Sequence, residues 1–107
     1  MRRLIAGVGA VLTAAVFAAS APAATKTVSV NDDTFAPAAV TVTKGSTVTW
    51  VWRGKDKHNV TVKSGPVRFA SATQSKGSFS KRLTRAGLYR LYCTVHGSKM
   101  SMSVRVR

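Results

Sequence analysis

The stretch VTVTKGSTVTWVW, residues 40–52, decides the fold class. Valine alternates with threonine over residues 40–43, and the same alternation continues from residue 47 to Trp50 and Trp52. A period of two places apolar side chains on one face of an extended chain, which indicates a half-buried β-strand. Lys44-Gly45-Ser46, between the two runs, is typical of a turn. The stretch therefore predicts two short strands separated by a turn.

The same alternation recurs along most of the chain. Turns such as Ser64-Gly65-Pro66 and Arg85-Ala86-Gly87 separate the apolar runs, and no stretch keeps a helical period. Strands at this spacing are typical of an all-β sandwich or barrel. The length of 107 residues fits a single domain. Seven strands are expected, at residues 27–30, 40–43, 47–52, 59–62, 78–80, 88–92 and 102–106.

The first 23 residues carry the features of a secretory signal. Arg2 and Arg3 form a basic start, residues 4–17 are uncharged, and Ala21-Pro22-Ala23 supplies small residues for cleavage. A membrane anchor, the alternative, needs about 20 apolar residues, and this run is shorter and contains glycine. The arginine pair leaves general and twin-arginine export open. We expect residues 1–23 to be a cleaved signal peptide and residues 24–107 to be the folded domain.

The chain is strongly basic, with 17 lysines and arginines against three acidic residues and a net charge of +14. Without residues 1–23 it keeps 84 residues and a charge of +12. The acids are Asp32, Asp33 and Asp56. Asp32 and Asp33 are expected to point to opposite sides of an extended chain. A paired-carboxylate hydrolase and an oxygen-ligand calcium site are therefore disfavoured.

The reactive side chains gather near the end of the chain. Cys93, His96 and Met100 lie on one segment between the last two predicted strands. A thiolate, an imidazole and a thioether form a soft ligand set, which suits copper. His58 is the only other histidine and follows a polar turn, so we expect it at the same end of a sandwich as Cys93. Two histidines, one cysteine and one methionine are the ligands of a blue-copper electron-transfer site.

With these residues the chain resembles the small bacterial cupredoxins of the plastocyanin and amicyanin kind. The resemblance implies a Greek-key β-sandwich of about eight strands. It also implies one mononuclear copper at one end of the sandwich, cycling between Cu(I) and Cu(II). The matching segments, in order, are Phe35-Ala36-Pro37, residues 40–50, His58-Asn59-Val60, Gly87-Leu88-Tyr89 and Tyr92-Cys93-Thr94-Val95-His96.

The resemblance assigns no catalytic residue, and the metal ligands that it implies are His58, Cys93, His96 and Met100. Met102 is a competing thioether on the same strand face, although the family pattern favours Met100. Val95 stands where relatives often have proline. Three residues separate His96 from Met100, one more than in the amicyanin-like loop. Asn59, outside the ligand set, is expected to tie the His58 strand to the Cys93 loop, while a backbone N–H near the Cys93 sulfur tunes the potential. The alternative is that Asn59 is a simple turn residue.

These features predict an exported blue copper protein that carries single electrons between redox partners and is not an enzyme. The alternative is a periplasmic or extracytoplasmic copper chaperone or store that uses the same site. A second, catalytic copper normally needs further imidazoles, and both histidines are already used. The expected location is the periplasm, the cell surface or the medium.

The positive charge predicts attraction to acidic redox proteins, with an anionic membrane surface or cell-wall polymer as a second candidate. Nucleic acid is not expected, because the chain is exported and its basic residues form no compact run. We expect a monomer. The residues expected to flank the copper end and steer docking are Lys55, Lys57, Lys63, Arg68 and Lys99. The resemblance also implies that the imidazole edge of His96 is an exposed port for electrons, and the residues expected around it are Ala36, Pro37, Pro66, Val95 and Gly97.

Overall fold

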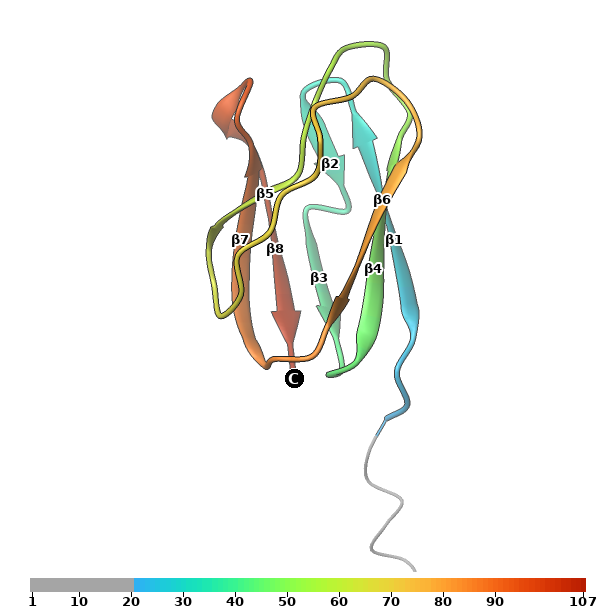
Figure 1. Ribbon diagram of the computed structural model, residues 1–107, viewed down its shortest axis with the longest axis vertical. Coiled ribbons are helices and arrows are strands. Elements are labelled where there is room, and N and C mark those ends of the chain that lie inside the picture. The colour runs from blue at the N-terminus through green and yellow to red at the C-terminus, as the bar shows by residue number, and fades with distance from the viewer. Residues whose placement is uncertain (1–20) are drawn as a thin grey trace, which may run out of the picture.

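The computed structural model describes residues 21–107, which form a sandwich of two β-sheets (Figure 1). The expected signal lies outside these residues, apart from its last three positions. The prediction of an all-β sandwich is confirmed, and residues 21–107 contain no helix that could span a membrane. The eight strands are β1 (Thr25–Asn31), β2 (Thr34–Ala36), β3 (Ala39–Val42), β4 (Ser46–Trp52), β5 (Thr61–Ser64), β6 (Ser78–Leu83), β7 (Gly87–Cys93) and β8 (Gly97–Val106).

Each sheet joins segments that are far apart in the sequence. One sheet has the strand order β2-β1-β4-β6 and the other has the order β3-β8-β7-β5. β1 runs parallel to β4, and β3 runs parallel to β8, whereas the other neighbours are antiparallel. The turn between β3 and β4 therefore crosses from one sheet to the other, and the stretch that decided the fold class contributes a strand to each layer.

The alternation along β4 builds the centre of the core. Val48, Trp50 and Trp52 are buried, while the residues between them are half-buried. The Trp50 ring lies 6.1 Å from the ring of Phe69, measured between centroids. Its indole N–H donates to Met102 Sδ of the opposite sheet at 3.2 Å. Trp50 thus joins the two layers through both apolar packing and a polar contact.

Several strand boundaries differ from the predicted ones, and three of the differences have a clear structural reason. β2, which pairs with β1, has only three residues and is too short to produce a readable alternation. β5 begins at Thr61 rather than residue 59, because the backbone before it pairs with residues 71–74 instead. β8 begins at Gly97, five residues earlier than predicted, because its pairing with β7 extends to the hairpin turn.

Three connections meet at one end of the sandwich, which we call the loop end (upper end in Figure 1): the β1–β2 turn, the β4–β5 segment and the β7–β8 hairpin. The β6–β7 turn lies at the opposite end. Two expectations about neighbours of the copper end are therefore wrong. Arg85 of the β6–β7 turn donates to the Pro66 carbonyl at 3.4 Å. β5 thus carries the chain away from the loop end, and Pro66 and Arg68 lie beyond it.

Asn59 braces the loop end from inside. Its buried side-chain carbonyl accepts hydrogen bonds from the Thr94 backbone N–H at 3.1 Å and from the Thr61 hydroxyl at 2.8 Å. Its amide group donates to Thr94 Oγ1 at 2.8 Å and to Thr73 Oγ1 at 3.0 Å. Two donors and two bonds to the carbonyl use the full capacity of the side chain. Asn59 therefore links the β4–β5 segment to the residue that follows Cys93.

Replacing Asn59 with alanine should lower the free energy of unfolding of the metal-free protein by about 1–3 kcal/mol, because the Thr94 N–H loses its partner in a part-buried place. Thr94→Val is the matched control: it removes one hydroxyl but keeps the bond from the Thr94 N–H, so its effect should be smaller. Urea denaturation of the two variants measures both. Equal losses would contradict a dominant role for the backbone bond.

Candidate metal centre

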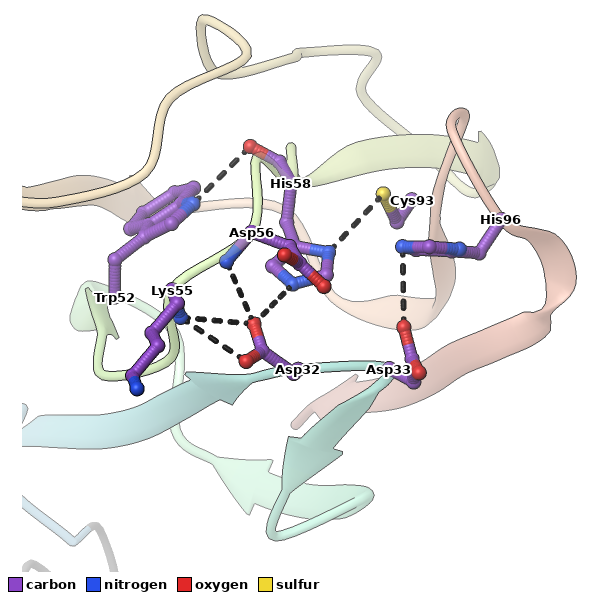
Figure 2. Close-up of polar contacts among 8 residues, drawn as sticks. All are labelled: Asp32, Asp33, Trp52, Lys55, Asp56, His58, Cys93 and His96. Carbon is purple, nitrogen blue, oxygen red and sulfur yellow. Dashed lines mark hydrogen bonds and ion pairs between the residues drawn. The ribbon is translucent and has the colours of Figure 1, made fainter.

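Three segments bring the chemically reactive side chains together at the loop end (Figure 2). Cys93 ends β7, and His96 stands in the hairpin turn that leads to β8. His58 lies in the β4–β5 segment, and the β1–β2 turn presents Asp32 and Asp33 from below in the view of Figure 2. The expectation that His58 and the Cys93 segment share one end of the sandwich is therefore met.

His58 and Cys93 face each other in the interior. Both side chains are fully buried, and Cys93 is a free thiol. The Nδ1 atom of His58 lies 3.9 Å from the Sγ atom of Cys93. This separation is short enough for both atoms to bind one metal ion.

Packing and hydrogen bonds fix His58 on several sides. The Trp52 indole N–H donates to the His58 carbonyl at 3.1 Å. The His58 backbone also pairs in both directions with Gln74, at 3.0 Å each way. The position of the His58 backbone is thus set by β4 and by the segment around Gln74.

His96 completes the cluster from the solvent side. Its ring centroid lies 5.0 Å from that of His58, and its side chain is 30% exposed. The Nε2 atom itself is buried and has no hydrogen-bond partner among the described residues. Asp33 Oδ1 lies 3.2 Å from it but outside hydrogen-bonding geometry. A buried ring nitrogen without a partner is available to a ligand.

The two adjacent aspartates face the same way, contrary to expectation. Asp32 and Asp33 occupy a tight turn between β1 and β2 rather than an extended strand, and Asp33 has a φ of 69°. Aspartate tolerates this left-handed conformation better than most residues. One carboxylate therefore reaches His58 and the other reaches His96. One ligand atom each of Asp33, His58 and His96 lie within 4.8 Å of one another.

Asp32 makes the larger set of contacts. Its carboxylate accepts the backbone N–H of Lys55 at 3.0 Å, that of Asp56 at 2.9 Å and a contact from His58 Nε2 at 3.1 Å. The two backbone N–H groups, that of Asp56 first, and then the His58 side chain lower the pKa of Asp32 from 3.8 to about 2. The carboxylate is therefore ionised at neutral pH.

The two methionines of β8 have different environments. Both are buried, but Met102 packs in the core, where its sulfur accepts the Trp50 N–H. Met100 lies two residues closer to the hairpin, and its sulfur accepts no hydrogen bond from the described residues. Of the residues expected around His96, Val95 is 55% exposed and lies in the same turn.

The contacts from Asp32 and Asp33 were missed by sequence reasoning. An adjacent pair of aspartates between two runs of alternating residues is itself a turn signal, and it could have placed both carboxylates at the end of a hairpin. No local pattern, however, relates this turn to His58, which follows 26 residues later.

The donor set fits copper. A thiolate and two imidazoles combine one soft sulfur with two borderline nitrogens, which suits both oxidation states of copper. The unpartnered Nε2 of His96 and the Nδ1 of His58 that faces the thiol are the free donor atoms observed here. The residues present therefore match the group that the sequence predicts.

Known proteins place this arrangement in a family. A family model described as copper binding proteins of the plastocyanin/azurin family matches residues 23–107. No curated protein sequence matches the chain. A reduced Cu(I) form of an amicyanin variant superposes with a TM-score of 0.69 at 29% identity, covering 84% of this chain and 88% of the other.

Two further structures share the fold at lower identity. A purple cupredoxin from Nitrosopumilus maritimus has a TM-score of 0.69 at 20% identity, over 77% of this chain and 99% of that protein. The copper-containing nitrite reductase of Thermus scotoductus SA-01 has a TM-score of 0.67 at 23% identity, over 77% of this chain. The present chain spans only 22% of that reductase. The matched family model, the two-sheet fold and the donor set lead to one conclusion: the chain belongs to the plastocyanin/azurin family of copper-binding proteins and is a small cupredoxin that binds one copper.

Proposed function

We propose that this protein is an exported one-electron carrier whose copper is held by His58, Cys93, His96 and Met100. The observation that carries the proposal is the preassembled pair of His58 Nδ1 and Cys93 Sγ, 3.9 Å apart and fully buried. Bound copper would supply exchange of a single electron between Cu(I) and Cu(II). Both donors are buried and the His58 backbone is held by Trp52 and Gln74, so little should have to move when the electron enters or leaves.

Met100 is the better axial candidate because the Met102 sulfur already accepts the Trp50 N–H in the core. A shift of Met102 toward the site would break this contact and leave a buried indole N–H without a partner. Met100 lies nearer than Met102 to the hairpin that carries His96, and both methionines are buried.

The solvent edge of His96 is the proposed route for electrons. His58 and Cys93 are closed to solvent, whereas the His96 side chain is 30% exposed beside Val95. A partner that contacts this edge would reach a ligand directly. The protein is proposed to act without catalysing a reaction of its own, since both histidines serve one copper and no imidazole is left for a second.

The charge supports an acidic redox partner. Of the expected steering residues, Lys55 and Lys57 lie in the β4–β5 segment and Lys99 lies at the β7–β8 hairpin, all three exposed at the loop end. Lys63 on β5 projects over the Tyr92 ring, 5.8 Å from its centroid. Anionic membranes or cell-wall polymers would be attracted by the same field. Export itself rests on the sequence of residues 1–23.

Adding Cu(II) to the purified protein should give an intense visible band from charge transfer between the Cys93 thiolate and the metal. Cys93→Ser should abolish the band, because a hydroxyl cannot supply this transition. Thr94→Ser is the control, since it changes the neighbouring residue and keeps the thiol. The band is measured by absorption at equal copper loading. An intense band that persisted in Cys93→Ser would contradict the assignment of Cys93 as a ligand.

Met100→Leu should retain copper and raise the reduction potential, because an axial thioether is a long, weak ligand that favours Cu(II) slightly. Met102→Leu should change the potential less and should act mainly on stability, through the lost contact with Trp50. Voltammetry and electron paramagnetic resonance of the two variants compare them directly. A larger potential shift in Met102→Leu would reverse the assignment.

Electron exchange with a negatively charged oxidant should slow by roughly tenfold or more as salt rises from about 0.01 to 0.1 M, since the screening length falls from about 30 to 10 Å. Lys57→Glu and Lys99→Glu should slow it further at low salt. Lys44→Glu, in the turn between β3 and β4 at the opposite end, is the charge-matched control. Stopped-flow rates that are flat in salt and equal in all three variants would exclude steering.

A further inference from the structure

We propose that Asp32 is the positioning residue of the metal centre: its carboxylate holds the His58 ring in the tautomer that keeps the proton on Nε2 and turns the unprotonated Nδ1 toward Cys93. The inference rests on the proposed function only in taking His58 as a metal ligand. Asp32 is not among the site residues that the sequence predicts.

The tautomer follows from the chemistry of the contact. Asp32 Oδ1 lies 3.1 Å from His58 Nε2, and an ionised carboxylate can only accept a hydrogen bond. Nε2 must therefore carry the proton. In a neutral imidazole the other nitrogen then has a free lone pair, and that nitrogen is the one that lies 3.9 Å from the Cys93 sulfur. The ring is fully buried, so water does not compete for either position.

The carboxylate is itself held in place by the chain. Lys55 N donates to both of its oxygens at 3.0 Å, and Asp56 N donates to Oδ1 at 2.9 Å. Gly54 permits this close approach: a Cβ at that position would lie 2.2 Å from Asp32 Oδ1 and 2.7 Å from the Asp32 backbone nitrogen. The β4–β5 segment therefore closes around the aspartate from the β1–β2 turn just before it delivers His58 (Figure 2).

The other two acids do not have this geometry. Asp33 is 68% exposed and approaches His96 outside hydrogen-bonding geometry, whereas the Asp32 side chain is 38% exposed. Asp56 contributes its backbone N–H to Asp32, and its carboxylate accepts no hydrogen bond from residues 21–107. Asp32 alone combines a bond to a buried ligand histidine with a backbone cradle.

Two consequences follow from a carboxylate behind a ligating imidazole. The ring is oriented before the metal binds, and its basicity is raised, which strengthens it as a ligand. A stronger nitrogen donor favours Cu(II) over Cu(I), so Asp32 should lower the reduction potential as well as increase affinity for Cu(II).

The test compares Asp32→Ala and Asp32→Asn with the control Asp56→Asn. Nitrogen-15 NMR of the metal-free protein reports the tautomer of His58, Cu(II) titration reports affinity, and voltammetry reports the potential. Asp32→Ala should lose the preference for the Nε2 proton and weaken Cu(II) binding by about 10–100-fold. Asp32→Asn keeps an oxygen acceptor and should retain the tautomer but raise the potential, because the charge is gone. Asp56→Asn removes the same charge nearby and should preserve the tautomer and affinity.

Retention of both the tautomer and Cu(II) affinity in Asp32→Ala would overturn the proposal, and so would equal shifts of the potential in Asp32→Asn and Asp56→Asn. If Asp32→Ala does not fold, Asp32→Asn decides alone: an unchanged potential overturns the proposal and a raised one, absent in Asp56→Asn, supports it. The tautomer is measured without copper. Failure of the ligand assignment would instead appear as a missing visible band in the unmodified protein.

Discussion

The Cys93 thiol approaches the His58 ring, and this contact joins two segments that are 35 residues apart: the end of β7 and the segment between β4 and β5. Neither side chain could hold this position alone, because a thiol and an imidazole attract each other weakly. Asn59 supplies the constraint from one side through its bond with the Thr94 N–H. Trp52 supplies it from the other side through the His58 carbonyl. The geometry of the site is therefore set by the contact with Trp52 of the core and by the hydrogen bonds of the Asn59 side chain.

The chain as a whole is strongly positive, whereas acidic side chains gather at the metal centre. The chain carries a net charge of +14, yet two of its three acidic side chains contact the two histidines. A long-range field that attracts anions thus coexists with a local cluster of carboxylates that would favour a bound cation. The two effects act over different distances, because screening by salt weakens the first far more than contacts of about 3 Å.

The fold and the meeting of His58, Cys93 and His96 at one end of the sandwich could largely be predicted from the sequence, and for different reasons. Alternation over residues 40–52 identifies strands because the period of two is a local property. Cys93 and His96 stand close together in the sequence, so their common loop needs no tertiary information. Asp32 could not be assigned in this way, because its contact with His58 depends on how the β1–β2 turn meets the β4–β5 segment. Arg68 was misplaced for a similar reason, since its distance from the loop end depends on the direction of β5.

A contact between residues far apart in the sequence also explains why alternation along β8 could not show which methionine is the axial candidate. Met100 and Met102 share one face of β8 and are both buried, so alternation treats them alike. The Trp50 N–H distinguishes them, and Trp50 lies on a strand of the opposite sheet. A contact between sheets thus determines which sulfur remains free.

The histidines differ in how much of their geometry the fold provides. His58 is fixed through its ring, its carbonyl and its backbone N–H. His96 is held within its own turn by a bond from its backbone N–H to the Cys93 carbonyl at 3.2 Å, and its ring nitrogen lacks a hydrogen-bond partner among residues 21–107. The buried His58 is therefore held by more protein contacts than the partly exposed His96. Since His96 is also the histidine that reaches solvent, beside the exposed Val95, a protein that docks at the loop end would contact His96 before His58.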